Sequence, residues 1–177
     1  MISLRELKEE DALLMLEWMH DPEIQKGFKK NFLDASVEDA KTFIKRAKIP
    51  NKIINGSDLH FAIVNEDDTY LGTVSLKRID LDNLSAEFAI TTRKKIHGRG
   101  VASRATRLVL HKAFLEYGLH RVYLNVYADN ADAIRLYKRC GFRFEGEFRD
   151  HIKRDNRYVN WKWFGILDSE FREKYDN

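Results

Sequence analysis

The sequence of 177 residues contains one cysteine, Cys140, and two prolines, Pro22 and Pro50. A single cysteine cannot form an internal disulfide or hold a metal by itself, which fits a reducing, cytoplasmic location. The scarcity of proline and the lack of any stretch rich in serine and glycine leave no segment typical of a linker. Because 177 residues is also an ordinary size for one domain, we expect a single domain over residues 1–177.

Long hydrophobic runs are also missing. The longest uncharged apolar runs, such as 12–16 and 61–64, fall far short of the ~20 residues of a membrane span, and the N-terminus lacks a signal-peptide core. The net charge of +3 does not argue for nucleic acid, and the six histidines show no metal-ligand spacing. A hydrophobic content of 44% with 33% charged residues is typical of a globular protein. We therefore expect no membrane, nucleic-acid or metal partner.

Periodicity predicts a mixed α/β fold. In the first half, alternating apolar residues predict strands at 2–6, 59–64, 70–79 and 84–90, the last three of which form an antiparallel meander. Apolar residues at helical spacing predict a helix over 9–19, ended by Asp21-Pro22. Ser36 and Asp39 resemble a capping box for a helix that reaches about residue 48.

The second half alternates helices and strands. We expect a helix over 98–117, a strand over 121–127, a helix over 131–140, and strands over about 143–152 and 157–167. Asp155-Asn156 is the turn signal of the final hairpin. Together with the meander, this order predicts a mixed, mostly antiparallel central sheet with helices on both faces.

The most informative motif is Lys-Ile-His-Gly-Arg-Gly-Val-Ala at residues 95–102. It lies between a strand and a helix, where two glycines allow close approach of a phosphate and the free N–H groups of the helix point at the anion. Lys94 and Arg104 add nearby positive charge. The motif is neither a Walker loop nor a dinucleotide fingerprint, because the lysine of the first and the third glycine of the second are missing.

A second motif follows about thirty residues later. Asn130 is a natural helix N-cap, Tyr137 falls on the third turn, and Gly141-Phe142 follows the helix end. With Ala133, these residues match Asn-x-x-Ala-x-x-x-Tyr-x-x-x-Gly-Phe, and residues 95–102 match Gln/Arg-x-x-Gly-x-Gly/Ala except that Lys95 replaces Gln or Arg. The two motifs at this spacing resemble the signatures of the GCN5-related N-acetyltransferase (GNAT) superfamily, and the resemblance covers nearly the whole chain.

The resemblance implies that acetyl-CoA is the co-substrate. Strands 84–90 and 121–127 then splay apart, the pantetheine arm lies in the gap, and the thioester carbonyl accepts from a backbone N–H near Ala89 or Ile90. Arg104 and Arg107 either reach the cofactor phosphates or form a solvated face. The cofactor-binding residues that the resemblance implies are Phe88, Ala89, Ile90, Lys95, His97, Gly98, Arg99, Gly100, Val101, Ala102 and Asn130.

Acetyl transfer to an amine requires removal of a proton from the ammonium, whose pKa is ~10.4, and protonation of the departing thiolate. Glu87, near the end of the strand that faces the gap, is our candidate for the base or a substrate anchor; the alternative is a solvent-facing carboxylate at a sheet edge. Tyr137 is our candidate for the acid, against an alternative role in core packing. Trp161 and Trp163 share one face of the last strand, and they serve the core, a wall of the acceptor pocket or a homodimer contact.

The acceptor is the least determined feature. Residues 18–32 and the closing hairpin resemble a subgroup related to ribosomal-protein N-terminal acetyltransferases, which also includes polyamine acetyltransferases and enzymes of nucleotide-linked amino sugars. Five basic residues favour a small amine carrying a diphosphate, a nucleotide-linked amino sugar: Lys26, Lys29, Lys30, Arg46 and Lys48. Carboxylates that instead suit a polyamine are Asp21, Glu23, Asp34, Glu38 and Asp39. A protein N-terminus, and an acyl-CoA sensor without turnover, are the remaining alternatives.

Overall fold

The computed structural model describes residues 1–50 and 52–175, which build one seven-stranded sheet in the order β1-β2-β3-β4-β5-β7-β6. All neighbouring strands are antiparallel except β4 and β5, which are parallel. The predicted mixed, mostly antiparallel sheet is therefore confirmed. The strands are β1 (Ile2–Glu6), β2 (Leu59–Asn65), β3 (Tyr70–Asp80), β4 (Ser85–Thr92), β5 (Arg121–Tyr127), β6 (Arg143–Arg154) and β7 (Arg157–Leu167).

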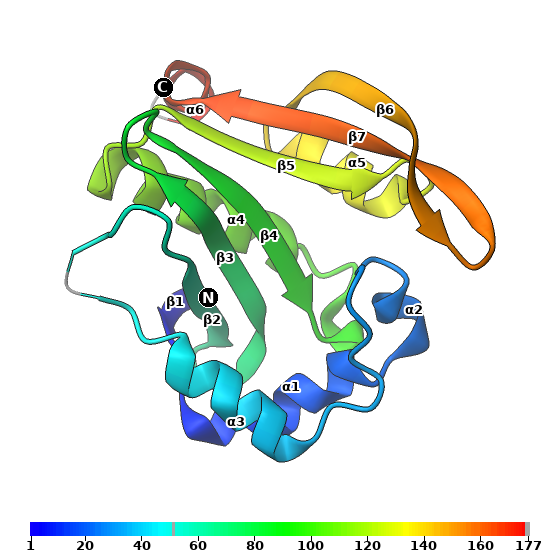
Figure 1. Ribbon diagram of the computed structural model, residues 1–177. Coiled ribbons are helices and arrows are strands. Elements are labelled where there is room, and N and C mark those ends of the chain that lie inside the picture. The colour runs from blue at the N-terminus through cyan, green and yellow to red at the C-terminus, as the bar shows by residue number, and fades with distance from the viewer. Residues whose placement is uncertain (51, 176–177) are drawn as a thin grey trace.

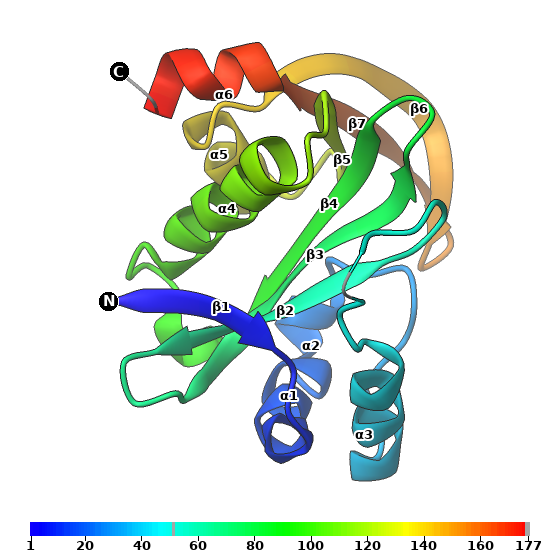
Figure 2. The ribbon, with the colours of Figure 1, turned by 90° about the vertical axis from the view of Figure 1, so that its left-hand side faces the viewer.

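Helices cover both faces of the sheet, as Figures 1 and 2 show. On one face lie α1 (Ala12–Met19), α2 (Pro22–Gln25) and α3 (Val37–Arg46); on the other lie α4 (Val101–His111), α5 (Ala131–Arg139) and α6 (Asp168–Tyr175). Strand β2 has apolar side chains on both of its faces, because helices cover the sheet on both sides. Phe61 and Ile63 pack in the core beneath α4, whereas Ala62 and Val64 pack beneath α1 and α3, because successive side chains of a strand point to opposite faces.

The helix predicted from residue 98 begins at Val101 instead. Gly98 and Gly100 have φ values of +76° and +72°, which form a tight turn that an α-helix cannot include. The last predicted turn of that helix, Lys112–Glu116, is π-helical. Helix α6 follows β7 directly and was not expected from the sequence pattern.

Asp21-Pro22 starts a second helix as well as ending the first. The Asp21 side chain accepts hydrogen bonds from the backbone N–H groups of Glu23 and Ile24 at 2.8 and 3.3 Å, and Pro22 occupies the first helical position. The predicted capping box of α3 is confirmed, since Ser36 and Asp39 exchange side chain to backbone hydrogen bonds of 2.8 and 3.1 Å.

Strands β4 and β5 pair only over their first residues, from Ser85 with Arg121 to Glu87 with Tyr123. Beyond Glu87, β4 remains bonded to β3 and β5 remains bonded to β7, but the two parallel strands separate, as Figure 1 shows. The edge of β4 that faces away from β3 therefore presents unpaired backbone groups. This is the splayed pair that the family resemblance implied. Among the described residues, no helix is both long and apolar enough to cross a membrane.

Candidate active site

A cleft of about 730 Å³ opens where β4 and β5 separate. Its walls come from β4, β5, the start of α5, the segment around α2, and the turn before α4. Of the predicted site residues, eight line this cleft: Glu87, Phe88, Ala89, Ile90, His97, Ala102, Asn130 and Tyr137. Segments far apart in the chain therefore meet at the parting strands.

The turn at the N-terminus of α4 has the features of a phosphate site. Gly100 is the N-cap in the left-handed conformation, and because glycine has no side chain, nothing on that residue caps the first N–H groups of the helix. His97 is hydrogen-bonded to the Thr92 carbonyl oxygen at 3.2 Å, and Arg104 donates to the Arg99 carbonyl oxygen at 3.2 Å. Five predicted cofactor residues lie in this turn and the start of the helix, beside the cleft: Lys95, Gly98, Arg99, Gly100 and Val101.

Arg93 anchors this turn to the helices on the opposite face of the sheet. Its side chain is 1% exposed, and it donates to both carboxylate oxygens of Glu17 on α1 and to the Tyr70 carbonyl oxygen. The next residue, Lys94, pairs with Asp21 at 3.4 Å. The start of the candidate phosphate turn is thus tied to α1 and to the N-cap of α2.

Helix α5 supplies one side of the cleft. The Asn130 side chain accepts from the Ala133 N–H at 3.2 Å, which confirms the predicted N-cap. Tyr137 is half-buried, and its ring packs edge-on against Phe88 and Phe142 with centroid distances of 6.0 Å. Burial raises the pKa of Tyr137 to about 12. Its hydroxyl therefore keeps its proton throughout the neutral range.

Glu87 lies on the opposite face of β4 from Phe88, as strand alternation predicts. The residue is 8% exposed, and Lys77 and Arg78 approach its two carboxylate oxygens at 3.6 and 3.1 Å. Lys77 approaches Oε1 and Arg78 approaches Oε2. The Arg78 contact lacks hydrogen-bond geometry, so Oε2 is buried without a hydrogen-bond partner in the described structure. A buried carboxylate oxygen with this capacity unused can accept a proton or bind an ammonium group.

A strained backbone places Arg78 beside this carboxylate. Arg78 has a φ of +49°, rare for a residue with a side chain, and it lies in an irregularity of the β3–β4 pairing between Lys77 and Asp80. The Asp58 side chain holds it by accepting from its backbone N–H at 2.7 Å. Such strain persists where surrounding contacts fix it, commonly near functional sites.

The segment after α2 forms another wall of the cleft. Phe28 stacks on Trp18 of α1 with a centroid distance of 5.6 Å, and the following residue, Lys29, places its ammonium 3.7 Å from the centroid of the Trp161 ring. Trp161 lies on β7 and lines the cleft, as one of the alternatives for this residue anticipated. Trp163 packs on the same face as Trp161, while Phe164 enters the core, as predicted.

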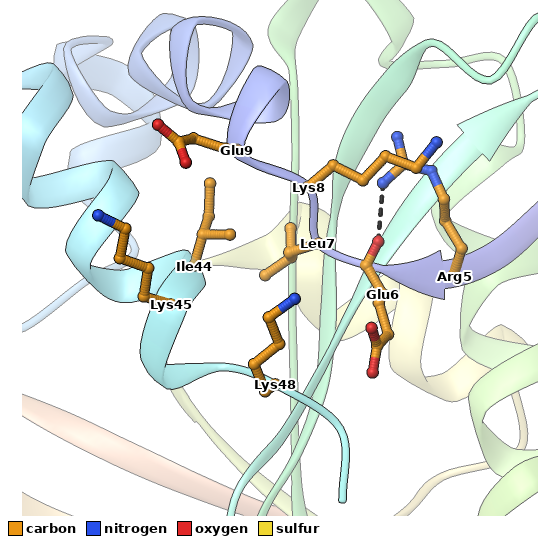
Figure 3. Close-up of a pocket in the computed structure, with 8 residues that line it drawn as sticks. All are labelled: Arg5, Glu6, Leu7, Lys8, Glu9, Ile44, Lys45 and Lys48. Carbon is orange, nitrogen blue, oxygen red and sulfur yellow. Dashed lines mark hydrogen bonds between the residues drawn. The ribbon is translucent and has the colours of Figure 1, made fainter.

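Several basic residues named from the sequence lie away from the cleft. Arg107 packs over the Tyr175 ring of α6 at 4.9 Å, and Lys30 lies over Phe32 at 5.3 Å. Lys48 lines a separate hollow of about 410 Å³ between β1 and α3, shown in Figure 3. That hollow contains none of the predicted catalytic or cofactor-binding residues, so we place the active site at the parting strands.

Residues that the sequence analysis missed include Lys77, Arg78, Asn125 and Arg154, all of which line the cleft. They come from β3, β5 and the distal hairpin and belong to no local motif, so only the fold brings them together. In the part of the chain that the structure describes, no group of three His, Cys, Asp or Glu side chains is arranged to hold a metal ion.

Comparisons with known proteins agree with this geometry. A family model described as "Acetyltransferase (GNAT) domain" matches residues 2–143. An N-acetyltransferase of Bacillus licheniformis is 29% identical over 172 residues, which cover 96% of this chain and 94% of that protein. Spermidine N(1)-acetyltransferase of Vibrio cholerae is 30% identical over 135 residues, covering 76% of this chain and 78% of that protein.

A solved structure shares the whole architecture. The crystal structure of spermidine N-acetyltransferase from Vibrio cholerae in complex with CoA and spermine superposes with a TM-score of 0.83 and 25% identity, covering 96% of this chain and 97% of that one. The chain belongs to the GNAT acetyltransferase family. It is an N-acetyltransferase with acetyl-CoA as co-substrate.

Proposed function

We propose that this enzyme acetylates a primary amine of a polyamine such as spermidine. The observation that carries the proposal is the Glu87 carboxylate, buried in the cleft at the point where the strands part, whose Oε2 is ion-paired with Arg78 at 3.1 Å but accepts no hydrogen bond. Three further carboxylates line the same cleft, each paired with a basic side chain: Glu23 with Lys26, Asp129 with Arg154 and Arg157, and Asp132 with Arg135. The similarity to spermidine acetyltransferases over most of the chain supports the same acceptor class.

We assign the cofactor to residues that line or adjoin the cleft. The N–H groups at the start of α4 and the Gly98–Gly100 turn bind the pyrophosphate, and Asn130 at the N-terminus of α5 contacts the pantetheine arm. Unpaired N–H groups of β4 near Ala89 or Ile90 bind the thioester oxygen. When bound, acetyl-CoA supplies the acetyl group as a thioester whose thiol can leave.

Glu87 and Tyr137 transfer the protons of the reaction. Glu87 takes a proton from the acceptor ammonium, directly or through a water molecule, so that the nitrogen lone pair can attack. The Tyr137 hydroxyl, on the other side of β4, donates to the sulfur as it leaves. The bond formed is N–C and the bond broken is C–S. The nitrogen loses two protons between ammonium and amide: Glu87 takes the first and releases it to solvent, and the second leaves after attack and balances, through solvent, the proton that Tyr137 gives to the thiolate.

The structure weakens the preference for a nucleotide-linked amino sugar. That preference required five basic residues to converge on a diphosphate, yet only Lys26 and Lys29 of that set line the cleft. Lys48 faces the other hollow, and Lys26 is already paired with Glu23 at 2.7 Å. The corresponding carboxylates do not converge either, because Asp39 caps α3 and Asp21 caps α2.

A panel assay tests the proposal. The protein is supplied with acetyl-CoA and, separately, spermidine, spermine, a free amino acid, a short peptide and a nucleotide-linked amino sugar, and free thiol is measured. We expect thiol release with the polyamines well above the rate without acceptor. Binding of acetyl-CoA without thiol release for any amine would instead support a sensor, and preferential turnover of the amino sugar would restore that alternative.

A further inference from the structure

The Lys29–Trp161 contact brings a cation of the chain itself into the acceptor side of the cleft. The Lys29 ammonium lies 3.7 Å from the Trp161 ring centroid, within the range of a cation–π interaction. Both residues line the cleft that contains Glu87. A protein ammonium therefore already occupies an aromatic surface in a site where an amine must bind.

The surroundings of Lys29 make this contact easy to exchange. In the described part of the chain, Lys29 has no ion-pair partner, and its ammonium rests on the indole alone. Burial and the nearby Arg78 cation lower the pKa of Lys29, although the Glu87 charge acts in the opposite direction. An acceptor ammonium on the same ring meets the same burial and the same Arg78 cation, so the exchange is driven by the second ammonium group that the acceptor places near Glu87.

Trp161, by contrast, is held in place. Its ring stacks on His151 at 5.1 Å with an interplanar angle of 27° and contacts Trp163 at 6.0 Å. Its backbone pairs with Tyr127, another residue of the cleft wall. The stacking of Phe28 on Trp18 anchors the backbone just before Lys29, so the lysine side chain can turn away without moving the segment.

We propose that the indole face of Trp161 is a subsite for an ammonium group of the acceptor, and that Lys29 occupies this subsite until an acceptor displaces it. The inference rests on the proposed function, because it assigns to Trp161 an amine of the acceptor other than the one that is acetylated beside Glu87. Acceptors with two or more ammonium groups can fill both positions and expel Lys29. A monoamine fills only one position and leaves Lys29 in place.

Kinetics with substituted proteins test the subsite. Lys29→Ala removes the competitor, so KM for spermidine should fall about threefold to tenfold, the range of a partly desolvated cation–π contact. Lys30→Ala is the matched control, since it removes the same charge from the next residue, whose ammonium lies over Phe32 instead. KM should stay within about twofold of the parent for that control, which lies outside the cleft lining.

A double-mutant cycle separates occupation of the subsite from general charge repulsion. Lys29→Ala should lower KM in the parent but have little effect in a Trp161→Leu background, where the subsite is absent. Equal effects in both backgrounds would show that Lys29 acts only as a distant charge and would overturn the proposal. So would an unchanged or raised KM in Lys29→Ala.

A second measurement does not depend on polyamine turnover or on the folding of Trp161→Leu. Tetramethylammonium binds aromatic faces but cannot be acetylated, and its titration can be followed at the Trp161 indole N–H resonance, assigned with Trp161→Phe. Binding should be several-fold tighter in Lys29→Ala than in the parent or in Lys30→Ala. Equal binding in all three proteins would exclude the subsite, whereas absent spermidine turnover with stronger binding in Lys29→Ala would refute only the proposed polyamine substrate.

Discussion

Glu87 on β4 and Tyr123 on β5 lie opposite each other as the last paired residues before the two parallel strands separate. Burial and the neighbouring Glu87 charge both raise the pKa of Tyr123. The same separation that ends the pairing opens the cleft. The candidate base is therefore fixed at the point where acetyl donor and amine can meet.

Acetyl-CoA should stabilise the protein against heat. At a concentration one hundred times Kd, a ligand that binds only the folded state contributes about 2.7 kcal/mol, which for a chain of this size raises Tm by roughly 5–10 °C. A thermal melt with and without CoA measures this. Failure of CoA to raise Tm, together with no heat of binding in calorimetry, would contradict the assigned phosphate turn.

Gly100→Ala should impair CoA binding more than it impairs folding. The added Cβ has room, with Arg104 Nη1 at 3.5 Å, but alanine at a φ of +72° costs about 1–2 kcal/mol and places a methyl group where a phosphate approaches. Gly56→Ala is the matched control, because Gly56 has a φ of +78° and open space but lies outside the cleft. We expect similar losses of Tm in both variants and at least a tenfold weaker Kd for CoA only in Gly100→Ala. Equal CoA affinities in the two variants would argue against the phosphate turn.

Tyr137→Phe should lower kcat by about 10²–10⁴-fold while leaving CoA affinity close to the parent value, since the ring remains and only the proton donor is lost. Tyr158→Phe, on an exposed ring of β7, is the control and should behave as the parent. A kcat of Tyr137→Phe within twofold of the parent would return Tyr137 to a packing role.

The pH dependence of Tyr137 follows from its burial. Because its pKa is raised from 10.0 to about 12, the hydroxyl is still protonated where an ordinary tyrosine has ionised. The alkaline limb of kcat should therefore show no loss attributable to Tyr137 near pH 10. The neutral side chain also contributes folding stability that is complete below pH 10.0 and lost as the pH rises through about 12. An alkaline loss of kcat near pH 10 that disappears in Tyr137→Phe would contradict this.

Glu87→Gln should reduce kcat/KM for polyamines, because an amide neither accepts a proton nor attracts an ammonium group. A loss in kcat of about 10²–10⁴-fold, with a changed acidic limb of the pH profile, would identify a base; a rise in KM alone would identify an anchor. Glu145→Gln is a control on the same sheet, since Glu145 pairs with Arg121 outside the cleft. Unchanged kcat/KM in Glu87→Gln would remove Glu87 from the mechanism.

Local signals predicted much of the fold. Strand alternation, the Ser36–Asp39 capping box and the Asn130 N-cap each depend on neighbouring residues, so the sequence reports them directly. The start of α4 was placed too early because the glycines at 98 and 100 were included in the helix, whereas their positive φ values place them before it. Helix α6 was missed because its stability depends on Phe171 packing against the core rather than on a strong apolar pattern.

In the candidate site, too, residues in local motifs could be predicted and contacts made by the fold could not. Gly100, Asn130 and Tyr137 belong to motifs with fixed spacing and could be named from the sequence. Lys29 over Trp161 could not, because that pair joins segments distant in the chain, and Arg78 beside Glu87 could not, because that contact depends on an irregularity in the pairing of β3 with β4. The sequence does not show which distant residues share a surface, and for this reason the predicted basic cluster was wrong. Lys29 lies in the cleft, whereas Lys48 lies in the separate hollow.

We propose that the cleft between β4 and β5 transfers an acetyl group from acetyl-CoA to a polyamine. The most direct test is a competition in which spermidine, a free amino acid and a nucleotide-linked amino sugar are present at equal concentration with limiting acetyl-CoA, and the acetylated products are counted by mass spectrometry. The ratio of products reports the ratio of kcat/KM values without any fitting of separate curves. We expect acetylspermidine to dominate in the parent protein and to be strongly reduced in Glu87→Gln. A product mixture dominated by the acetylated amino sugar or amino acid, or one that Glu87→Gln leaves unchanged, would contradict the proposal.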